Sequence, residues 1–354
     1  MIRVLIVDDS ALMRALLTRK LEAEPDITVI AVAANAAEAR TLIKSHDPDV
    51  VTLDIEMPGM DGLAFLEKIM TLRPTPVIIV SGSTHEGAAA TARALQLGAV
   101  GCYAKASANR SLADDDSGEL ADLVREAASV RLAARPQSSR PATAPAIKRP
   151  AVRSQAAPFA LSPEVIVIGA STGGVEALNS LLAGFPEDCP PTLIVQHINA
   201  CFAPAIVQSL DRAARPRVRL AESDHPLQAG EVLLAPGDDK HLMVAPAGSR
   251  GYRAVMRAGD KVSGHRPSVD QLFASAARTL GDKALGILLT GMGEDGARGL
   301  AAMARSGAHT IAQDEASCVV FGMPRAAIAL GGAREVLALD AIAARIFAPT
   351  KVIS

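Results

Sequence analysis

Short hydrophobic runs, separated by stretches of mixed polarity, recur along the first third of this chain. Each run is about as long as a strand buried on both faces, and the stretches between the runs have the periodicity of amphipathic helices. Strands that alternate with helices are typical of a parallel, doubly wound sheet. The pattern therefore predicts an α/β unit with five strands, at Val4–Val7, Val29–Ala33, Val50–Leu53, Val77–Val80 and Ala99–Tyr103.

The same rhythm returns after residue 161 and predicts a second α/β unit. Runs at Val165–Ile168, Leu193–Val195 and Leu285–Leu289 have the composition of buried strands in a mainly parallel sheet. Residues 230–260, which lie between the second and third runs, are rich in glycine and proline. We expect this middle region to form short antiparallel strands and hairpins beside a second doubly wound sheet.

A stretch of different composition separates the two units. Residues 131–154 contain six Lys or Arg, four prolines and no acidic residue. A segment with so few large apolar side chains cannot build a core. We therefore predict domains at residues 1–130 and 162–354, joined by a flexible basic linker at residues 131–161. The linker reads as a solubilising tether, and the alternative is a basic docking strip for an acidic partner.

Charge and composition narrow the class of protein. A net charge of -2 over 354 residues gives no general attraction to nucleic acid or to an anionic membrane, so neither is an expected partner. Charged residues interrupt the N-terminal apolar run too early for a signal peptide, and no apolar run is long enough to span a bilayer, so we expect a cytoplasmic protein. The four cysteines lack CxxC spacing and are expected to be reduced thiols.

Acidic side chains gather at strand ends in the N-terminal unit. Asp8 and Asp9 end the first predicted strand, and Asp54 ends the third. Carboxylates that meet at one edge of a parallel sheet repel one another unless a hard cation lies among them, and Mg²⁺ suits such oxygen ligands. Ser81 and Lys105 end the fourth and fifth strands, where a hydroxyl and an ammonium group would contact a phosphorylated carboxylate.

These residues and their spacing resemble the receiver domain of two-component response regulators over roughly residues 1–130. The resemblance is carried by Val-Asp-Asp-Ser, by Leu-Asp-Ile-Glu-Met-Pro-Gly-Met-Asp-Gly, and by the serine and lysine that follow. The resemblance implies these roles: phosphoacceptor, Asp54; Mg²⁺ ligands, Asp8, Asp9, Asp54 and the backbone of Glu56; switch hydroxyl, Ser81; phosphate contact, Lys105.

Two positions depart from the receiver pattern. Ala106 replaces the proline that usually follows the lysine, and Cys102 stands where an aromatic switch residue is common, with Tyr103 one position further on. Because a lysine-proline bond often adopts the cis form and directs the loop, the departure at Ala106 concerns the signalling geometry around Lys105. It does not concern phosphorylation itself.

A serine lies in a glycine-rich turn at the start of the C-terminal unit. Ser171 follows a predicted strand and precedes a predicted helix, and Gly169–Gly173 fits the G-x-S-x-G pattern of a nucleophile elbow. The N-terminus of such a helix offers free N–H groups and positive potential to an oxyanion. The same glycines also suit an anion cradle or a degenerate nucleotide loop, although neither G-x-G-x-x-G nor a Gly-Lys-Ser/Thr ending is present.

A serine nucleophile needs a base and an orienting acid at neighbouring strand ends. His197 follows the strand run that ends at Gln196, and Asp295 follows the run that ends at Leu289. His241, before a predicted strand, and His265, before a predicted helix, are competing histidines that also read as loop residues. His197 and Cys201 could form half of a zinc site, but no second Cys/His pair completes it.

The C-terminal half resembles the catalytic domain of the chemotaxis protein-glutamate methylesterases, whose members carry a receiver in front. Its motifs here include Ile-Gly-Ala-Ser-Thr-Gly-Gly, Val-Gln-His-Ile, His-Arg-Pro-Ser-Val-Asp and Leu-Thr-Gly-Met-Gly-Glu-Asp-Gly. The resemblance implies these roles: nucleophile, Ser171; general base and then acid, His197; orienting carboxylate, Asp295; lining of the oxyanion site, Thr172 and Met292. Glu294 occupies a position that is often asparagine in the family.

The resemblance implies a phosphorylation-activated hydrolase of chemotaxis adaptation. Its substrates would be glutamate methyl esters on methyl-accepting chemoreceptors, with methanol released, and receptor glutamines would be deamidated by the same path. A chemotaxis histidine kinase would supply the phosphoryl group, Mg²⁺ would serve the receiver, and ester hydrolysis would need no cofactor. The alternatives are a non-enzymatic response regulator with a binding or nucleotide-sensing second half, and an esterase that serves a sensory array with an output other than flagella.

Overall fold

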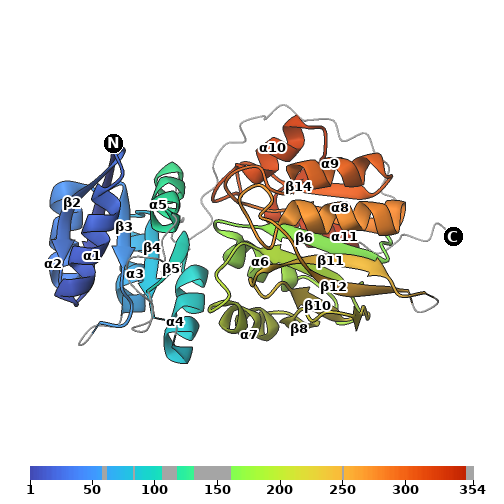
Figure 1. Ribbon diagram of the computed structural model, residues 1–354, viewed down its shortest axis with the longest axis horizontal. Helices are drawn as coiled ribbons and strands as arrows, with labels where there is room; N and C mark the ends of the chain where they lie inside the picture. Colours follow the sequence, from blue (N-terminus) through green and yellow to red (C-terminus); the bar gives the residue numbers. More distant parts are fainter. Residues whose placement is uncertain (58–61, 83, 106–117, 131–160, 249–250, 348–354) are drawn as a thin grey trace, which may run out of the picture.

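The computed structural model describes residues 1–57, 62–82, 84–105, 118–130, 161–248 and 251–347. Within these ranges the chain forms two α/β units that lie against each other (Figure 1). Almost all of the predicted linker, residues 131–160, lies outside the described residues, as does Ala106. None of the described helices is long and apolar enough to cross a membrane.

The N-terminal unit is a five-stranded parallel sheet with helices on both faces, which confirms the prediction. The strand order is β2-β1-β3-β4-β5. The strands are β1 (Ile2–Val7), β2 (Ile27–Ala33), β3 (Val50–Leu53), β4 (Val77–Ser81) and β5 (Gly101–Ala104). The helices are α1 (Ala11–Glu22), α2 (Ala36–His46), α3 (Gly62–Leu72), α4 (His85–Gln96) and α5 (Glu119–Ser129).

Alternate residues along the strands form two separate hydrophobic layers. Val4 and Ile6 of β1 pack in the layer that includes Val124 of α5. Leu5 and Val7 lie in the layer on the other face, with side chains of α2, α3 and α4. Because successive strand side chains point to opposite faces, a sheet covered on both sides needs continuous apolar runs, and the runs in the sequence meet this need.

The C-terminal unit holds a seven-stranded parallel sheet and a three-stranded antiparallel sheet. The strand order of the larger sheet is β15-β14-β13-β6-β7-β10-β8, and that of the smaller sheet is β11-β12-β9. In the larger sheet the strands are β6 (Val165–Ala170), β7 (Thr192–Gln196), β8 (Arg217–Leu220), β10 (Glu231–Leu234), β13 (Ala284–Leu288), β14 (His309–Gln313) and β15 (Glu335–Leu337). In the smaller sheet they are β9 (His225–Pro226), β11 (Lys240–Pro246) and β12 (Tyr252–Ala258).

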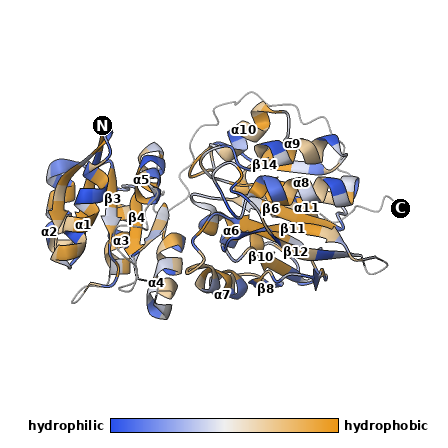
Figure 2. Cartoon of the chain, viewed as in Figure 1, coloured by the Kyte–Doolittle hydropathy of each residue, from blue (hydrophilic) through white to orange (hydrophobic). Residues whose placement is uncertain are grey.

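The prediction for the middle region is confirmed in one part and wrong in another. Strands β11 and β12 form the expected antiparallel hairpin. Strand β10, however, pairs in parallel with β7 and β8 in the larger sheet. Its three apolar residues fill a fully buried position in that sheet, and Figure 2 shows the central strands of both units as predominantly hydrophobic.

Helices cover both faces of the larger sheet. They are α6 (Gly174–Leu182), α7 (Ala203–Ala213), α8 (Val269–Leu280), α9 (Ala297–Arg305), α10 (Met323–Ala329) and α11 (Leu339–Phe347), with a short 3-10 turn at Gly281–Lys283. Strands β13, β6 and β7 are neighbours and run in the same direction, so their carboxyl ends meet at one edge. The loops that follow these three strands carry the predicted triad residues.

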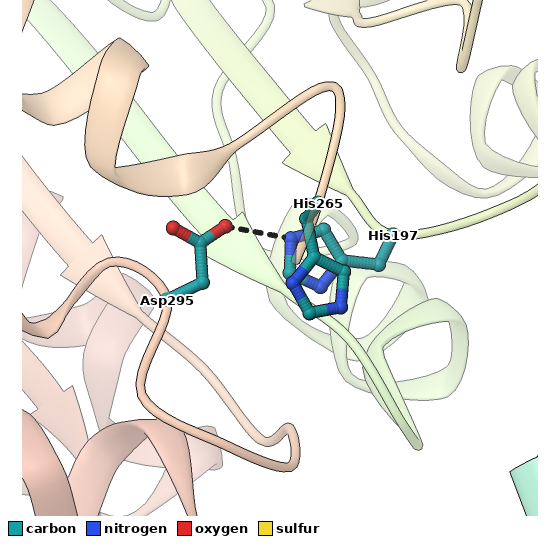
Figure 3. Close-up of side chains that lie close together, drawn as sticks. All are labelled: His197, His265 and Asp295. Atoms are coloured by element: carbon teal, nitrogen blue, oxygen red, sulfur yellow. Dashed lines mark hydrogen bonds and ion pairs between the residues drawn. The ribbon is translucent and has the colours of Figure 1, made fainter. Parts of the chain in front are cut away.

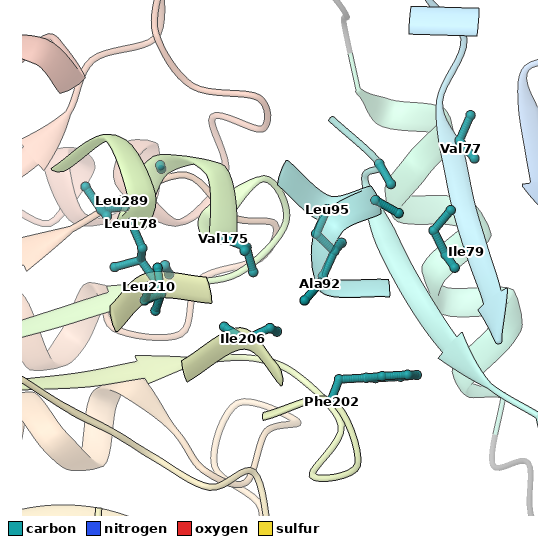
Figure 4. Close-up of a cluster of buried hydrophobic side chains, with 14 of the residues drawn as sticks. Val77, Ile79, Ala92, Leu95, Val175, Leu178, Phe202, Ile206, Leu210 and Leu289 are labelled. Carbon is teal, nitrogen blue, oxygen red and sulfur yellow. The ribbon is translucent and has the colours of Figure 1, made fainter. Parts of the chain in front are cut away.

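The receiver-like unit contacts the C-terminal unit chiefly through helix α4. This helix packs against α6 and α7. Ala92 and Leu95 of α4 face Val175 of α6 and belong to one hydrophobic cluster that spans both units (Figure 4). The side chains of Gln96 and Ser209 add a hydrogen bond between α4 and α7.

Candidate active site

Ser171 lies in the tight loop between β6 and α6, as the glycine pattern predicts. Gly173, which caps the helix, has a φ of 75°, a conformation that glycine adopts without strain. A Cβ on Gly174 would lie only 2.1 Å from Oε1 of Gln196, so this position also requires glycine. The loop therefore holds Ser171 close to the neighbouring strand, with 7% of the residue exposed.

Two side chains that the sequence analysis did not single out hold this loop in place. Gln196 Nε2 donates to the carbonyl oxygens of Ser171, at 2.8 Å, and His197, at 3.1 Å. Thr290 Oγ1 donates to the carbonyl of Thr172 at 2.9 Å, and the Thr290 carbonyl accepts from the Ser171 N–H at 3.0 Å. Gln196 directly precedes His197, and Thr290 lies in the motif that contains Asp295. This closeness in sequence to predicted site residues is the signal that could have identified them.

His197 and Asp295 meet at the edge where Ser171 lies. His197 Nε2 is 2.8 Å from Asp295 Oδ2, and Figure 3 shows this bond between side chains of two different loops. A proton on Nε2 leaves the lone pair on Nδ1, so Nδ1 is the ring nitrogen that is able to accept a proton. His197 Nδ1 is buried and has no hydrogen-bond partner within the described ranges, so it is available to a proton from a nearby hydroxyl.

Asp295 is held by the N-terminus of helix α8. Its Oδ1 accepts from Ser268 Oγ at 2.7 Å and from the Asp270 N–H at 3.0 Å, and its Oδ2 accepts from the Val269 N–H at 2.8 Å. Burial alone would raise the pKa of Asp295, but the hydrogen bonds from His197, Ser268 and the backbone outweigh it and lower the pKa below 3.8. The carboxylate is therefore charged at neutral pH and fixes the imidazole.

The two competing histidines have different surroundings. His241 is buried, accepts from the Ser268 N–H at 3.1 Å and donates to the Asp260 carbonyl at 2.9 Å, so it supports the turn that holds Asp295. His265 stacks on His197, with ring centroids 3.7 Å apart and an interplanar angle of 4° (Figure 3). Burial and the neighbouring His197 lower the pKa of His265, which favours a neutral ring in this stack.

Three possible metal ligands converge here, but their hydrogen bonds suit a triad better. Ligand atoms of His197, His265 and Asp295 lie within 4.8 Å of one another. Both oxygens of Asp295 already accept two hydrogen bonds each, and His265 Nδ1 bonds to the Ser263 carbonyl at 2.8 Å. The zinc alternative, which paired His197 with Cys201, has no such cluster among the residues that the structure describes.

A cavity of about 420 Å³ opens beside Ser171. Thr172, His197 and His265 also line it, so the structure brings most of the predicted catalytic-half residues to one space. Met292 does not line this cavity; it packs against a hydrophobic cluster that contains Val320 and residues of the N-terminal unit. The cavity is bordered on its other side by residues of β5 and α5, which come from the N-terminal unit.

The acidic residues of the N-terminal unit form a second site at the carboxyl edge of its sheet. Carboxylate oxygens of Asp8, Asp9 and Asp54 lie within 4.8 Å of one another. Lys105 Nζ is 2.9 Å from Asp8 Oδ2 and 2.7 Å from Asp54 Oδ2. Burial raises the pKa of Asp8; Lys105 opposes this effect, and the negative charge of Asp54 adds to it. The single lysine therefore does not offset the negative charge of the cluster.

The remaining predicted receiver residues surround this cluster. The Glu56 N–H donates to Asp54 Oδ1 at 2.9 Å, and its side chain accepts from Thr84 Oγ1 at 3.3 Å. Ser81 ends β4, and its hydroxyl makes long hydrogen bonds of 3.4 Å to the carbonyls of Gly82 and Gly87. The oxygen donors fit a hard cation such as Mg²⁺.

All four cysteines are free, as predicted. Burial raises the pKa of the Cys102 thiol, and it raises the pKa of the Cys189 thiol to about 11. Cys102 also lines the cavity beside Ser171. The position where receivers commonly have an aromatic switch residue therefore faces the candidate active site.

Comparisons with known proteins agree with both halves. The family model described as CheB methylesterase matches residues 166–346, and the model of the response regulator receiver domain matches residues 4–115. A solved structure, the catalytic domain of a CheB methylesterase from Thermotoga maritima, is 34% identical, with a TM-score of 0.50, and covers 52% of this chain and 98% of that chain.

Two curated relatives match nearly the full length. A protein-glutamate methylesterase/protein-glutamine glutaminase from Caulobacter vibrioides is 49% identical over 341 residues, which cover 96% of this chain and 96% of the relative. One from Bordetella pertussis is 48% identical over 346 residues, which cover 98% of this chain and 96% of the relative.

Proposed function

Because this chain belongs to the CheB methylesterase family, we propose that it hydrolyses glutamate methyl esters on chemoreceptors and that its receiver domain sets the rate. We assign the receiver to residues 1–130 and the catalytic domain to residues 162–354. The observation that carries the proposal is the bond between His197 and Asp295 beside Ser171, at one edge of a parallel sheet. Deamidation of receptor glutamines uses the same residues, with ammonia as the leaving group.

The reaction begins when Ser171 Oγ attacks the ester carbonyl while His197 Nδ1 takes its proton. The protonated imidazole then donates to the leaving oxygen, so methanol departs and a glutamyl ester of the serine remains. Water, activated by the same nitrogen, attacks this ester and releases glutamate and free serine. Asp295 keeps the proton on Nε2 and stabilises the imidazolium in both steps.

The oxyanion is stabilised by backbone groups of the loop before helix α6 and of the loop after β13. The Ser171 N–H is committed to the Thr290 carbonyl and cannot serve. The N–H groups of Thr172 and Met292 donate no hydrogen bond within the described ranges, so both can donate a hydrogen bond to the oxyanion. The positive end of the α6 dipole adds to them. For Met292 the role rests on its backbone, since its side chain points elsewhere.

In the receiver, Asp54 is the phosphoacceptor. Asp8, Asp9, Asp54 and the backbone of Glu56 hold Mg²⁺, which when bound offsets the negative charge that gathers during phosphoryl transfer. Lys105 already contacts Asp54 and is placed to contact a phosphoryl group there, and Ser81 supplies the switch hydroxyl. A chemotaxis histidine kinase in the cytoplasm supplies the phosphoryl group.

The receiver restrains the enzyme by covering the triad. Residues of β5 and α5 border the cavity that contains Ser171, and α4 packs on the helix that follows this serine. A receptor helix cannot reach Ser171 while these contacts persist. Phosphorylation at Asp54 weakens these contacts between the domains. The path from the phosphorylation site to the cavity is short, because Gly101 and Cys102 of β5 line the cavity and Lys105 directly follows the same strand.

The decisive experiment measures methanol released from a carboxymethylated chemoreceptor cytoplasmic fragment. Wild type and Ser171→Ala are compared, each with and without a small phosphodonor and Mg²⁺. We expect release that rises with phosphodonor and falls by about 10⁴-fold or more in the variant, because the nucleophile is lost. Equal release from both proteins would refute Ser171 as the nucleophile. Tolerance of the variant in a partner-binding assay, without any hydrolysis, would favour a binding module.

A truncated chain tests the covering of the triad separately. A fragment of residues 162–354 should release methanol faster than unphosphorylated full-length protein, because β5 and α5 no longer border its cavity. A fragment that is no faster than the full-length protein would contradict this part of the proposal and leave the hydrolytic activity standing.

A further inference from the structure

One side of helix α5 in the receiver faces the active site, and that side is acidic. Glu119, Asp122, Leu123 and Glu126 recur at the spacing of one helical face, and all four line the cavity that contains Ser171. The opposite face of the helix is buried in the receiver core. Helix α5 therefore presents carboxylates to the hydrolytic groups of the other domain.

Among these side chains, Glu126 contacts the serine loop directly. Its Oε2 accepts a hydrogen bond of 3.0 Å from Oγ1 of Thr172, the residue that follows the nucleophile. Burial raises the pKa of Glu126, and the hydrogen bond from Thr172 opposes this effect. The nearby His265 ring stacks on His197. Glu126 thus lies beside the loop that carries Ser171 and lines the same cavity.

Among the described residues of its own domain, Glu126 has no cationic partner. The adjacent Arg125 does not line the cavity and pairs with Glu24, Asp26 and Asp122 of the receiver. Within the described ranges no lysine or arginine forms an ion pair with Glu126. The hydrogen-bond partner of this carboxyl group lies in the catalytic domain, in Thr172.

We propose that Glu126 occupies the place of the product glutamate, so that helix α5 acts as a built-in product analogue. The inference rests on the function proposed above, in which hydrolysis leaves a glutamate carboxylate on a receptor helix. Helix α5 presents the same group on the same kind of element. The Thr172 hydroxyl is then a shared contact: it binds Glu126 in the closed chain and a carboxyl oxygen of the substrate glutamate in the open chain.

The first test compares full-length Glu126→Ala with Asp122→Asn. Asp122 lies one turn away on the same helix and lines the same cavity, but bonds to Arg125 rather than to the catalytic domain. Glu126→Ala should raise methanol release by the unphosphorylated protein about tenfold, the effect of a lost hydrogen bond to a charged group. Asp122→Asn should change it less than about twofold. Equal effects of the two variants would overturn the proposal.

The second test separates product mimicry from simple docking. If Thr172 binds both groups, Thr172→Val should lower the ratio of phosphorylated to unphosphorylated rates and also raise KM for the receptor in the phosphorylated state, by about tenfold. Thr172→Ser keeps the hydroxyl and should restore both values. Glu126→Ala should lower the ratio but leave the phosphorylated KM unchanged. An unchanged phosphorylated KM in Thr172→Val would overturn the shared contact.

The two proposals fail in different ways. If wild type is not stimulated by phosphodonor, the proposed control by the receiver is wrong. If wild type is stimulated but Glu126→Ala is no faster than wild type before phosphorylation, control stands and product mimicry is wrong.

Discussion

Asp54 and Asp295 are both buried carboxylates at the carboxyl edge of a parallel sheet, yet their surroundings are opposite. Asp54 shares its site with Asp8 and Asp9 and has one strong cationic partner, Lys105. Asp295 accepts four hydrogen bonds, from His197, from Ser268 and from two backbone N–H groups. The same topological position therefore supports two chemistries, and the difference lies in whether neighbouring loops supply negative charge or donors.

The site around Asp54 needs a ligand to offset its negative charge, and we call it the responsive site. The site around Asp295 already has all its hydrogen-bond donors, and we call it the complete site. Crowded carboxylates in the receiver are unfavourable on their own, which makes the site responsive to a cation and to a phosphoryl group. Each oxygen of Asp295 already accepts two hydrogen bonds. These bonds make the carboxylate rigid and suit it to orienting His197. In the proposed function, the receiver changes state, whereas the triad stays fixed and is covered or uncovered.

The largest expected effect comes from breaking the complete site. Asp295→Asn should reduce kcat for methanol release by about 10³–10⁴-fold, because a neutral amide does not stabilise the imidazolium. Each carboxylate oxygen accepts from a backbone N–H, so either orientation of the amide places NH₂ against a donor. The rate is measured with phosphodonor and Mg²⁺ present.

Asp295→Asn also has an internal control. Phosphoryl transfer to Asp54 should continue at the wild-type rate, because the substitution lies in the other domain. A parallel loss of phosphorylation would indicate general misfolding rather than the loss of one catalytic contact.

Breaking the responsive site should have a smaller effect. Asp54→Asn should abolish stimulation by phosphodonor and Mg²⁺ while basal methanol release remains. The stimulation lost is expected to be about 5- to 150-fold, the range of typical coupling free energies between sites. Removal of Mg²⁺ by a chelator should have the same effect on wild type. Loss of basal release in Asp54→Asn would mean that Asp54 has a structural role.

The sequence predicts strands better than it predicts partners. The apolar runs located β1, β6 and β13 because each of these strands is buried on both faces. The pairing of β10 was missed because a four-residue run carries no local sign of parallel or antiparallel neighbours, and its partners are distant in sequence. Strands β14 and β15 were missed as well, since β14 has polar residues at both ends and β15 has only three residues.

The site shows the same limit. Ser171, His197 and Asp295 could be placed at strand ends by motif and spacing. The donors to Asp295 come from the start of α8, 25 to 27 residues earlier in the chain, and no pattern connects the two segments. The contact between Glu126 and Thr172 joins two domains across the linker, and only the packed structure reveals it.

The smallest expected effect is the opposite pH dependence of stability at the two sites. The pKa of Asp295 is lowered below 3.8, so its ionised form stabilises the fold above that pH, and this contribution is lost as pH falls through the lowered pKa. The pKa of Asp8 is raised above 3.8 by burial, so ionisation of Asp8 destabilises the fold, and that penalty disappears as pH falls through the raised pKa.

Two variants read these contributions without Mg²⁺. At neutral pH, Asp295→Asn should lower the free energy of unfolding and Asp8→Asn should increase it, by about 1 kcal/mol for each unit of pKa change removed. The difference for Asp8→Asn should shrink as pH is lowered through the raised pKa toward 3.8, the ordinary value for both groups, whereas the difference for Asp295→Asn should persist down to 3.8 and shrink only below it. Denaturant unfolding at several pH values measures this. Effects of the same sign in the two variants would mean that the contrast between a responsive and a complete site is wrong.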